Sequence, residues 1–176
     1  DSMAKYGMRI TPDQRAKILE YLATYLGPNP PKAAPAGASP PPPEKADGAA
    51  VFNEQCVACH QAHGEGVAGQ FPPLAGNRDI FLSADFPARV VLFGLKGKID
   101  VNGKGLDAEM PPLDFLSDAQ IAAAIGYVRG AWGNGKLRPA GMTDPDAAAV
   151  AALRKSKLSA AQVHDQRMTL KGAGKK

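Results

Sequence analysis

Residues 56–60 read Cys56-Val57-Ala58-Cys59-His60, and this stretch decides how the rest of the chain is interpreted. Two thiols at this spacing with an adjacent imidazole form the attachment site of a c-type haem. Each cysteine can add to one haem vinyl group as a thioether, and the histidine then lies under the iron as its proximal ligand. The stretch therefore predicts both a covalently bound cofactor and one of its axial ligands.

Three other interpretations of the Cys-x-x-Cys pair compete with haem attachment: a redox pair, half of a zinc site and a surface disulfide. A thioredoxin-like redox pair belongs in a βαβ context, which this sequence does not show. A zinc site needs more soft ligands than two cysteines and three histidines easily supply. Haem attachment is therefore the leading interpretation.

A haem iron held by histidine needs a sixth ligand for electron transfer, and methionine is the usual one because its soft thioether favours ferrous iron. The candidate is Met110, which lies ahead of Pro111 and Pro112 in a run that we expect to be a polar loop. The alternative for this side chain is to fill a gap in the core, as methionine often does. Between the motif and Met110, the run 71–77 contains a proline whose carbonyl could accept a hydrogen bond from the far ring nitrogen of His60.

Together these motifs resemble the class I cytochromes c, over about residues 46–134. The resemblance is carried by Gly48, Phe52, Cys56, Cys59, His60, Pro72, Pro73, Leu74, Ala75, Gly76, Met110, Pro111 and Tyr127. It implies an all-α fold with one class I cytochrome c domain. In that family the first and last helices cross at a contact between glycine and aromatic residues, which here would involve Gly48, Phe52, Ile125 and Tyr127.

The same resemblance implies one covalently bound haem c. The residues that it places in the haem site are Cys56, Cys59, His60, Met110, Pro72 and Leu74, with His60 and Met110 as the iron ligands. His63 is expected to be a loop residue, and His164 a solvent-exposed histidine with no ligand role.

Composition is consistent with a haem protein. Hydrophobic residues make up 44% of the 176 residues and aromatic residues only 6%, so the protein core is thin and a buried haem would add apolar surface. No run reaches the roughly 20 apolar residues that a membrane-spanning helix requires. The resemblance implies that the haem is attached outside the bacterial cytoplasm, as in other proteins of this type. We therefore interpret the chain, which opens at Asp1 without a signal peptide, as a processed product exported to the periplasm.

The net charge of +4 is unevenly distributed along the chain. Residues 136–176 contain nine Lys and Arg against three Asp, a net +6, which leaves −2 for residues 1–135. An acidic partner surface or an anionic membrane face would suit such a segment, and a solvated tail with no electrostatic role is the alternative. Nucleic acid is not an expected partner of an exported haem protein.

A second helix in the chain matches the last helix of the predicted haem domain. Residues 11–26 have helical periodicity, with Thr11 as the expected N-cap. At a constant offset of 106 the matched pairs are Thr11 and Ser117, Gln14 and Gln120, Leu19 and Ile125, Tyr21 and Tyr127, Leu22 and Val128, and Gly27 and Gly133. The two segments are interpreted as the same structural piece, with chance similarity between two amphipathic helices as the alternative.

On this interpretation Met3 stands within one residue of the position of Met110. The run 3–7 also resembles the ligand-methionine region of cytochrome subunits of sulfite and sulfur-compound dehydrogenases. No Cys-x-x-Cys-His precedes Met3 in this sequence. We therefore expect residues 1–27 to be the C-terminal helix of an incomplete first cytochrome c domain, whose haem, ligated by Met3, is carried by another segment or chain.

The expected domain order is residues 1–27, a Pro/Ala-rich linker over 28–46, the haem domain over 47–134 and an extended basic tail over 135–176. Within the haem domain we expect a helix capped by Asp47, a mostly looped segment over 61–82, and a helix over 87–93. An Asn-Gly hairpin turn at 102–103, ahead of the loop with Met110, and a last helix capped by Ser117 follow. Trp132 is expected to pack on the domain, and short helices are expected over 144–155 and 159–168.

The predicted function is one-electron transfer, as the cytochrome subunit or domain of a periplasmic dehydrogenase that passes electrons to a downstream acceptor. The chain is not expected to be catalytic by itself, and its expected partner is a redox protein. One alternative is a haem enzyme or gas sensor with an open distal site. Another is a structural subunit whose linker and tail wrap a larger partner while the haem relays electrons.

Overall fold

A computed structural model describes residues 15–16, 19–20, 22 and 46–173, and the chain divides into two units, residues 1–41 and 42–176. In the first unit the described residues are helical, and Leu19 and Leu22 are exposed. Met3 and residues 28–45 of the predicted linker lie outside the described residues. The predictions for the first cytochrome domain and for the linker therefore stay predictions.

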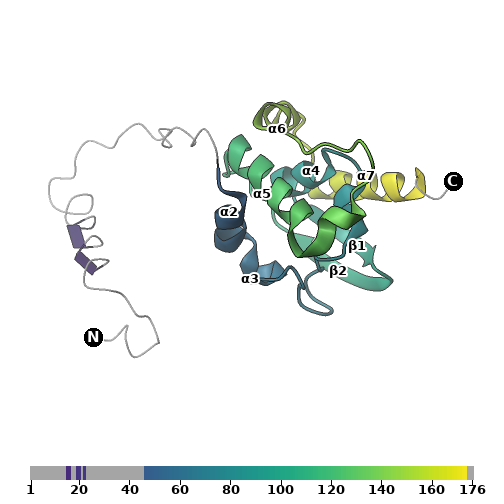
Figure 1. The fold of residues 1–176 in the computed structure, drawn as a ribbon, viewed down its shortest axis with the longest axis horizontal. Helices are drawn as coiled ribbons and strands as arrows, with labels where there is room; N and C mark the ends of the chain where they lie inside the picture. Colours follow the sequence, from purple (N-terminus) through teal and green to yellow (C-terminus); the bar gives the residue numbers. More distant parts are fainter. Residues whose placement is uncertain (1–14, 17–18, 21, 23–45, 174–176) are drawn as a thin grey trace. The chain divides into compact units, whose positions relative to one another are not determined.

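The second unit is mostly helical, with one small antiparallel sheet (Figure 1). Its elements in chain order are α2 (Gly48–Gln55), α3 (Val57–His60), η2 (Arg78–Phe81), α4 (Phe86–Phe93), β1 (Leu95–Val101), β2 (Lys104–Met110), α5 (Asp118–Gly130), η3 (Ala131–Leu137), α6 (Ala147–Arg154) and α7 (Ala160–Ala173).

Local sequence signals start the main helices where they were predicted. The Asp47 carboxylate accepts hydrogen bonds from the backbone N–H groups of Ala49 and Ala50, which would otherwise lack partners at the start of α2. Ser117 and Gln120 form a reciprocal capping box at the start of α5. Both caps are confirmed.

Helices α2 and α5 cross at the contact that the resemblance implied. A Cβ atom at Gly48 would lie 2.1 Å from the carbonyl oxygen of Ala123, so only glycine allows the two backbones to come this close. The rings of Phe52 on α2 and Tyr127 on α5 pack against each other across the same pair of helices, with their centroids 5.5 Å apart. Ile125, the fourth residue named for this contact, is buried in the neighbouring hydrophobic core.

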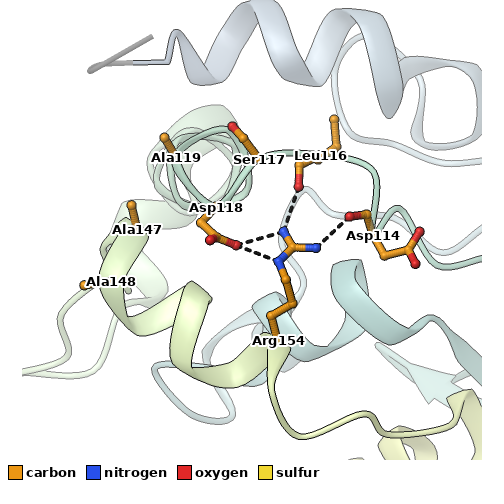
Figure 2. A pocket seen from close by; sticks show the side chains of 8 residues that line it. All are labelled: Asp114, Leu116, Ser117, Asp118, Ala119, Ala147, Ala148 and Arg154. Atoms are coloured by element: carbon orange, nitrogen blue, oxygen red, sulfur yellow. Dashed lines mark hydrogen bonds and ion pairs between the residues drawn. The ribbon is translucent and has the colours of Figure 1, made fainter. Parts of the chain in front are cut away.

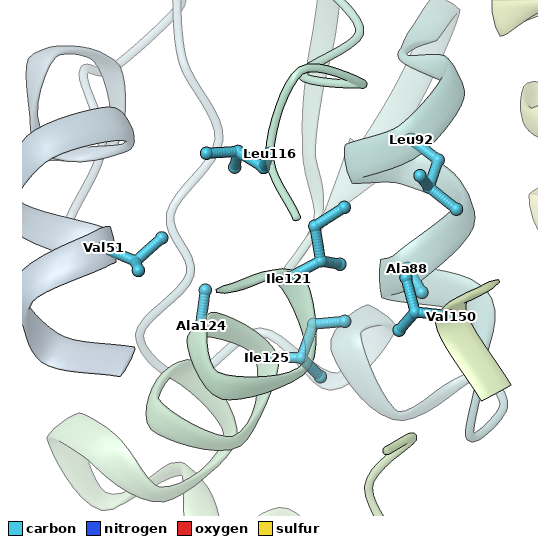
Figure 3. Close-up of a cluster of buried hydrophobic side chains, with 8 residues drawn as sticks. All are labelled: Val51, Ala88, Leu92, Leu116, Ile121, Ala124, Ile125 and Val150. Carbon is cyan, nitrogen blue, oxygen red and sulfur yellow. The ribbon is translucent and has the colours of Figure 1, made fainter. Parts of the chain in front are cut away.

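The main hydrophobic core lies between α2, α4, α5 and α6 (Figure 3). Its buried side chains are Val51, Ala88, Leu92, Leu116, Ile121, Ala124, Ile125 and Val150. Val150 belongs to α6, beyond the expected end of the haem domain, and it is fully buried. The core therefore includes part of the segment predicted to be a tail.

The prediction of an all-α fold is wrong in one region, because β1 and β2 form an antiparallel hairpin. Its turn is the predicted Asn102-Gly103 pair, and both residues have positive φ angles of 54° and 79°. One face of the hairpin carries a cluster of buried side chains: Ile99, Val101 and Leu106. Their burial stabilises this short ribbon. Met110 consequently ends a strand and does not lie in a polar loop.

The prediction of an extended tail is also wrong for the described part of residues 135–176. Helices α6 and α7 form close to the predicted ranges, and they pack against α4, α5 and β1. Val150 and Val163 are fully buried and anchor the two helices. Many of the basic side chains that suggested a tail form ion pairs inside the unit: Arg138 with Asp144, Arg154 with Asp118, and Arg167 and Lys171 with Asp79.

A buried arginine joins α5 to the segment before α4. Arg129 is fully buried, and it donates hydrogen bonds to the carbonyls of Ile80, Ser83 and Ala84 and to the carboxylate of Asp144. Burial alone would raise the pKa of Asp144, but hydrogen bonds from Arg138 and Arg129 outweigh it and hold that pKa below the ordinary value of 3.8. Ionised Asp144 therefore stabilises the fold.

The helix crossing predicts that Gly48→Ala will destabilise the protein strongly. The added methyl would meet the backbone of Ala123, which cannot rotate away, and we expect a loss of about 3 kcal/mol in the free energy of unfolding. Gly126→Ala on α5 is the control, since its Cβ would have only an ordinary contact of 3.8 Å with Asp144. Alanine is also the better helix former, by about 1 kcal/mol. Urea unfolding of the haem-loaded protein measures both variants, and equal losses would contradict the close crossing.

The Arg129–Asp144 pair predicts a pH dependence of stability. The folded protein lowers the pKa of Asp144. The stability that the ionised carboxylate contributes is therefore fully present above the unfolded-state pKa and is lost as the pH falls through the folded-state pKa. The stability difference between the wild type and Asp144→Asn should therefore be largest above about pH 5 and shrink below about pH 4. Denaturant unfolding across this range tests it, with Asp107→Asn on exposed β2 as the control. A difference that does not vary with pH would contradict it.

Candidate haem site

The Cys-x-x-Cys-His motif forms one helical turn directly after α2. Cys56 ends α2 and precedes α3, and the N–H of His60 donates to the carbonyl of Cys56 at 2.9 Å. Residues three and four apart share one face of a helix, so Cys56, Cys59 and His60 project from the same side of this turn. Both cysteines are free thiols; Cys56 is half-buried and Cys59 is exposed.

The environment of Cys56 does not match a reactive redox cysteine. Burial, with a smaller effect of neighbouring Cys59, raises the pKa of the Cys56 thiol to about 11. Disulfide oxidoreductases need the opposite shift, because the thiolate is the nucleophile. The pair therefore fits thiols that become thioethers better than a thioredoxin-like pair.

The imidazole of His60 is oriented by the carbonyl predicted for this role. His60 Nδ1 lies 3.0 Å from the carbonyl oxygen of Pro72. A carbonyl can only accept, so Nδ1 carries the proton and the lone pair on Nε2 is left for a metal. Burial lowers the pKa of His60 although the bond to Pro72 opposes this, which favours the neutral imidazole that a metal binds.

The loop that carries Pro72 folds back on the motif at two glycines. The carbonyl of Gly64 accepts hydrogen bonds from the N–H groups of Leu74 and Ala75, at 2.7 and 2.8 Å. The N–H of Gly66 donates to the carbonyl of His60, and a Cβ at Gly66 would lie 2.4 Å from the carbonyl oxygen of Phe71. Leu74, a predicted pocket residue, is thus tied to the same loop as Pro72.

η3, the short helix after α5, holds this loop through two side chains. The predicted packing of Trp132 is confirmed: its ring lies 5.0 Å from that of Phe52 and covers Gly64, where a Cβ would come within 2.6 Å of it. Asn134, fully buried, accepts from the N–H of Gly76 and donates to the carbonyls of Leu74 and Val128. The sequence analysis missed Asn134, whose only local signal is its position between Gly133 and Gly135.

Met110 is placed by the hairpin and not by the motif. It pairs with Leu95 across the two strands, and its carbonyl oxygen would lie 2.6 Å from a Cβ at Gly94. Its side chain is half-buried and belongs to neither cluster of buried hydrophobic residues. The structure thus brings together Cys56, Cys59, His60 and the loop of Pro72, and it places Met110 on a separate element.

Two other histidines were predicted not to be ligands. His63 is exposed in the loop after α3, with its backbone N–H bonded to Glu65. His164 does not match its prediction of full solvent exposure, because its ring packs against Gly97 and bonds the carbonyl of Lys98.

Two hollows on the second unit lie away from the motif. The larger, about 620 Å³, lies between the start of α5 and α6, where Arg154 points toward Asp118 and the carbonyls of Asp114 and Leu116 (Figure 2). The second, about 440 Å³, lies between α4 and α7. Cys56, Cys59 and His60 line neither of them. Within the part of the chain that the structure describes, no helix is both long and apolar enough to span a membrane.

The donor set fits a c-type haem. Two free thiols on one helical turn suit thioether formation, and a neutral imidazole with a free Nε2 suits iron. A side chain at Gly66 would collide with the loop backbone, and one at Gly64 would collide with the ring of Trp132, so glycine at both positions lets the loop stay close to the motif. Cys56, Cys59 and His60 would hold the cofactor.

Comparisons with known proteins agree with this chemistry. Cytochrome c-552 of Thermus thermophilus is 37% identical over 130 residues, which cover 72% of this chain and 98% of that protein. This match is longer than the 46–134 range from which a resemblance was predicted, so the likeness extends outside that range.

Dehydrogenase subunits match over shorter segments. The cytochrome c subunit of the quinone alcohol dehydrogenase of Gluconobacter oxydans (strain 621H) is 37% identical over 92 residues, covering 49% of this chain and 18% of that subunit. The gluconate 2-dehydrogenase cytochrome c subunit of Pantoea cypripedii is 31% identical over 91 residues, covering 50% and 20%. The cytochrome c family model matches residues 45–132, which contain the motif, the Pro72 loop and the crossing of α2 with α5. The chain belongs to the cytochrome c family.

Proposed function

We propose that this chain is an electron-transfer cytochrome whose haem c is attached through Cys56 and Cys59 and ligated by His60 and Met110. Membership of the family establishes covalently bound haem c and haem-based electron transfer. When bound, the haem supplies a one-electron couple whose potential depends on its axial ligands and surroundings. The observation that carries the residue assignment is the bond from His60 Nδ1 to the Pro72 carbonyl, which leaves Nε2 available to the iron.

The chain's own residues have separate tasks in this site. The two thiols fix the cofactor covalently, so neither reduction nor oxidation can release it. Pro72 holds the imidazole in one orientation and makes it a stronger donor. A fixed ligand geometry keeps the structural change between oxidation states small, which suits rapid one-electron transfer.

Support for Met110 as the sixth ligand comes from its position. The side chain is partly buried without belonging to a hydrophobic cluster, so a role as core filler does not account for it. The two prolines that follow cannot donate ladder hydrogen bonds, which ends the strand at this residue. A thioether at the end of a hairpin is available to bind a soft metal.

We further propose that the partner is a periplasmic dehydrogenase, from which this chain passes electrons to a downstream acceptor. The names of two relatives, subunits of quinone alcohol and gluconate dehydrogenases, support this class of partner. The chain matches only about a fifth of each of those subunits, so the proposal does not extend to their substrates. A second haem ligated by Met3 remains a prediction outside the described residues.

Replacing Met110 tests the distal ligand. Met110→Ala should abolish the sulfur-to-iron charge-transfer band at the red end of the oxidised spectrum. It should also lower the midpoint potential, on the order of 0.1 V within the roughly 0.8 V that axial ligands span. Met168→Ala is the control, because this methionine is 51% exposed on α7. A spectrum unchanged by Met110→Ala would reject the ligand, and a wild type lacking the band would favour the enzyme or gas-sensor alternative.

Replacing the thiols tests the attachment. Intact-mass spectrometry of protein matured in a host with haem-attachment machinery should show one covalent haem for the wild type. The Cys56→Ala, Cys59→Ala double variant should carry none, because these are the two cysteines of the chain. Met3→Ala should leave the count unchanged, since a thioether ligand forms no covalent link to the haem. Haem retained covalently by the double variant would contradict the assignment.

A further inference from the structure

We propose that α7 acts as a clamp that holds Met110 at the iron, and that Arg167 and His164 are positioning residues for this ligand. The proposal rests on the His60/Met110 ligation proposed above. It concerns the segment after residue 132, which the family model does not match. Figure 1 shows α7, in yellow, beside the hairpin of β1 and β2, and the contacts between them identify how the clamp is built.

The first part of the clamp is a buried charge cluster. Arg167 is only 2% exposed; its guanidinium pairs with the carboxylate of Asp79 on η2 and donates to the carbonyl of Asp100 on β1 at 2.6 Å. Lys171, one turn further along α7, binds the same two groups, at 3.2 Å to Asp79 and 2.9 Å to the Asp100 carbonyl. A buried guanidinium needs such partners, so moving α7 away from η2 and β1 would break the ion pairs with Asp79 and the hydrogen bonds to the Asp100 carbonyl together.

The second part of the clamp is the imidazole of His164. Its Nε2 donates to the carbonyl of Lys98 on β1 at 2.8 Å. The ring lies against Gly97, where a Cβ atom would come within 2.8 Å of the ring carbon Cδ2. The strand therefore has a glycine where the helix approaches it, and α7 holds β1 at two carbonyls, two residues apart.

The strand pairing carries this constraint to Met110. Residues 97, 98 and 100 of β1, which the clamp holds, pair with residues 108, 107 and 105 of β2. Leu95 pairs with Met110 itself and packs against the cluster of Ile99, Val101 and Leu106. Because paired strands move together, a displacement of β1 also displaces the end of β2 and its thioether.

The distribution of buried residues on α7 favours a positioning role over general packing. Among the 14 residues of the helix only Val163 and Arg167 are buried, so the helix is attached by one apolar anchor and by the polar contacts of Arg167, His164 and Lys171. Its charged contacts reach the hairpin and η2, and none of its residues belongs to the main core cluster. Loss of these contacts should therefore loosen the hairpin before it unfolds the core.

The experiment compares haem-loaded Arg167→Met with the wild type, with Arg167→Lys and with Val150→Ala. Imidazole is added to the ferric protein as a competing ligand, under conditions where every variant is folded. Arg167→Met should bind imidazole about tenfold more tightly than the wild type, equivalent to about 1.4 kcal/mol. Arg167→Lys should restore part of the difference. Hydrogen exchange of the β1 and β2 amides should rise in Arg167→Met.

Val150→Ala separates positioning from stability, since it removes a buried side chain of the main core without touching the hairpin. It should lower the unfolding midpoint and leave imidazole affinity within about twofold of the wild type, as expected for a site that does not couple to Met110. If Arg167→Met does not fold, His164→Ala replaces it, with the same expected direction. The proposal would be overturned if imidazole affinity and the hydrogen exchange of the β1 and β2 amides were unchanged in the Arg167 or His164 variant. It would also be overturned if Val150→Ala raised imidazole affinity as much as that variant does.

Met110→Ala distinguishes a failure of the clamp from a failure of the ligand assignment. If Met110 is the ligand, this variant binds imidazole tightly and adding Arg167→Met to it has no further effect. If Met110→Ala retains the charge-transfer band, the ligand assignment itself is wrong and the clamp has no ligand to hold. If the band is lost but Arg167→Met behaves as the wild type, the assignment stands and only the clamp is rejected.

Discussion

The close crossing of α2 and α5 at Gly48 is the constraint on which the haem site depends. A backbone carbonyl of α5 occupies the space that any side chain at this position would need, so only glycine lets the two helices cross this closely here. This fixes the end of α2, where Cys56 begins the motif, against the end of α5, where Trp132 and Asn134 begin the next segment. The contact between two distant parts of the chain thus determines where the motif lies.

From this crossing the constraint passes to the imidazole of His60, the proposed iron ligand, through side chains that do not touch it. Trp132 covers Gly64, and Asn134 bonds both Leu74 and Gly76, so the loop between these residues is held at both ends. Pro72 lies inside that loop, and its carbonyl meets Nδ1 of His60. The orientation of one side chain therefore depends on a buried amide on a different element, which is typical of how supporting residues set a metal ligand.

The last 40 residues show how a charged segment can be integrated into a domain. Four of its basic side chains are used in ion pairs within the second unit, with Arg167 the most deeply buried of them. Part of the positive charge that suggested a docking tail is thus paired within the unit, while Lys136, Lys155 and Lys157 are exposed. Charge along a sequence does not reveal whether its partner is another molecule or the same chain.

The sequence by itself determined the features that depend on neighbouring residues. The attachment motif, the caps at Asp47 and Ser117, and the turn at 102–103 were predicted because each is set by local spacing or backbone preference. Only the tertiary structure decided the length of the strands that run from this turn to Met110, the docking of α7 and the roles of Arg129, Asn134 and Arg167. Their partners are mostly backbone carbonyls 45 to 71 residues away in sequence, and every residue has a carbonyl. Which one accepts depends on where the fold brings it, and no sequence pattern records that.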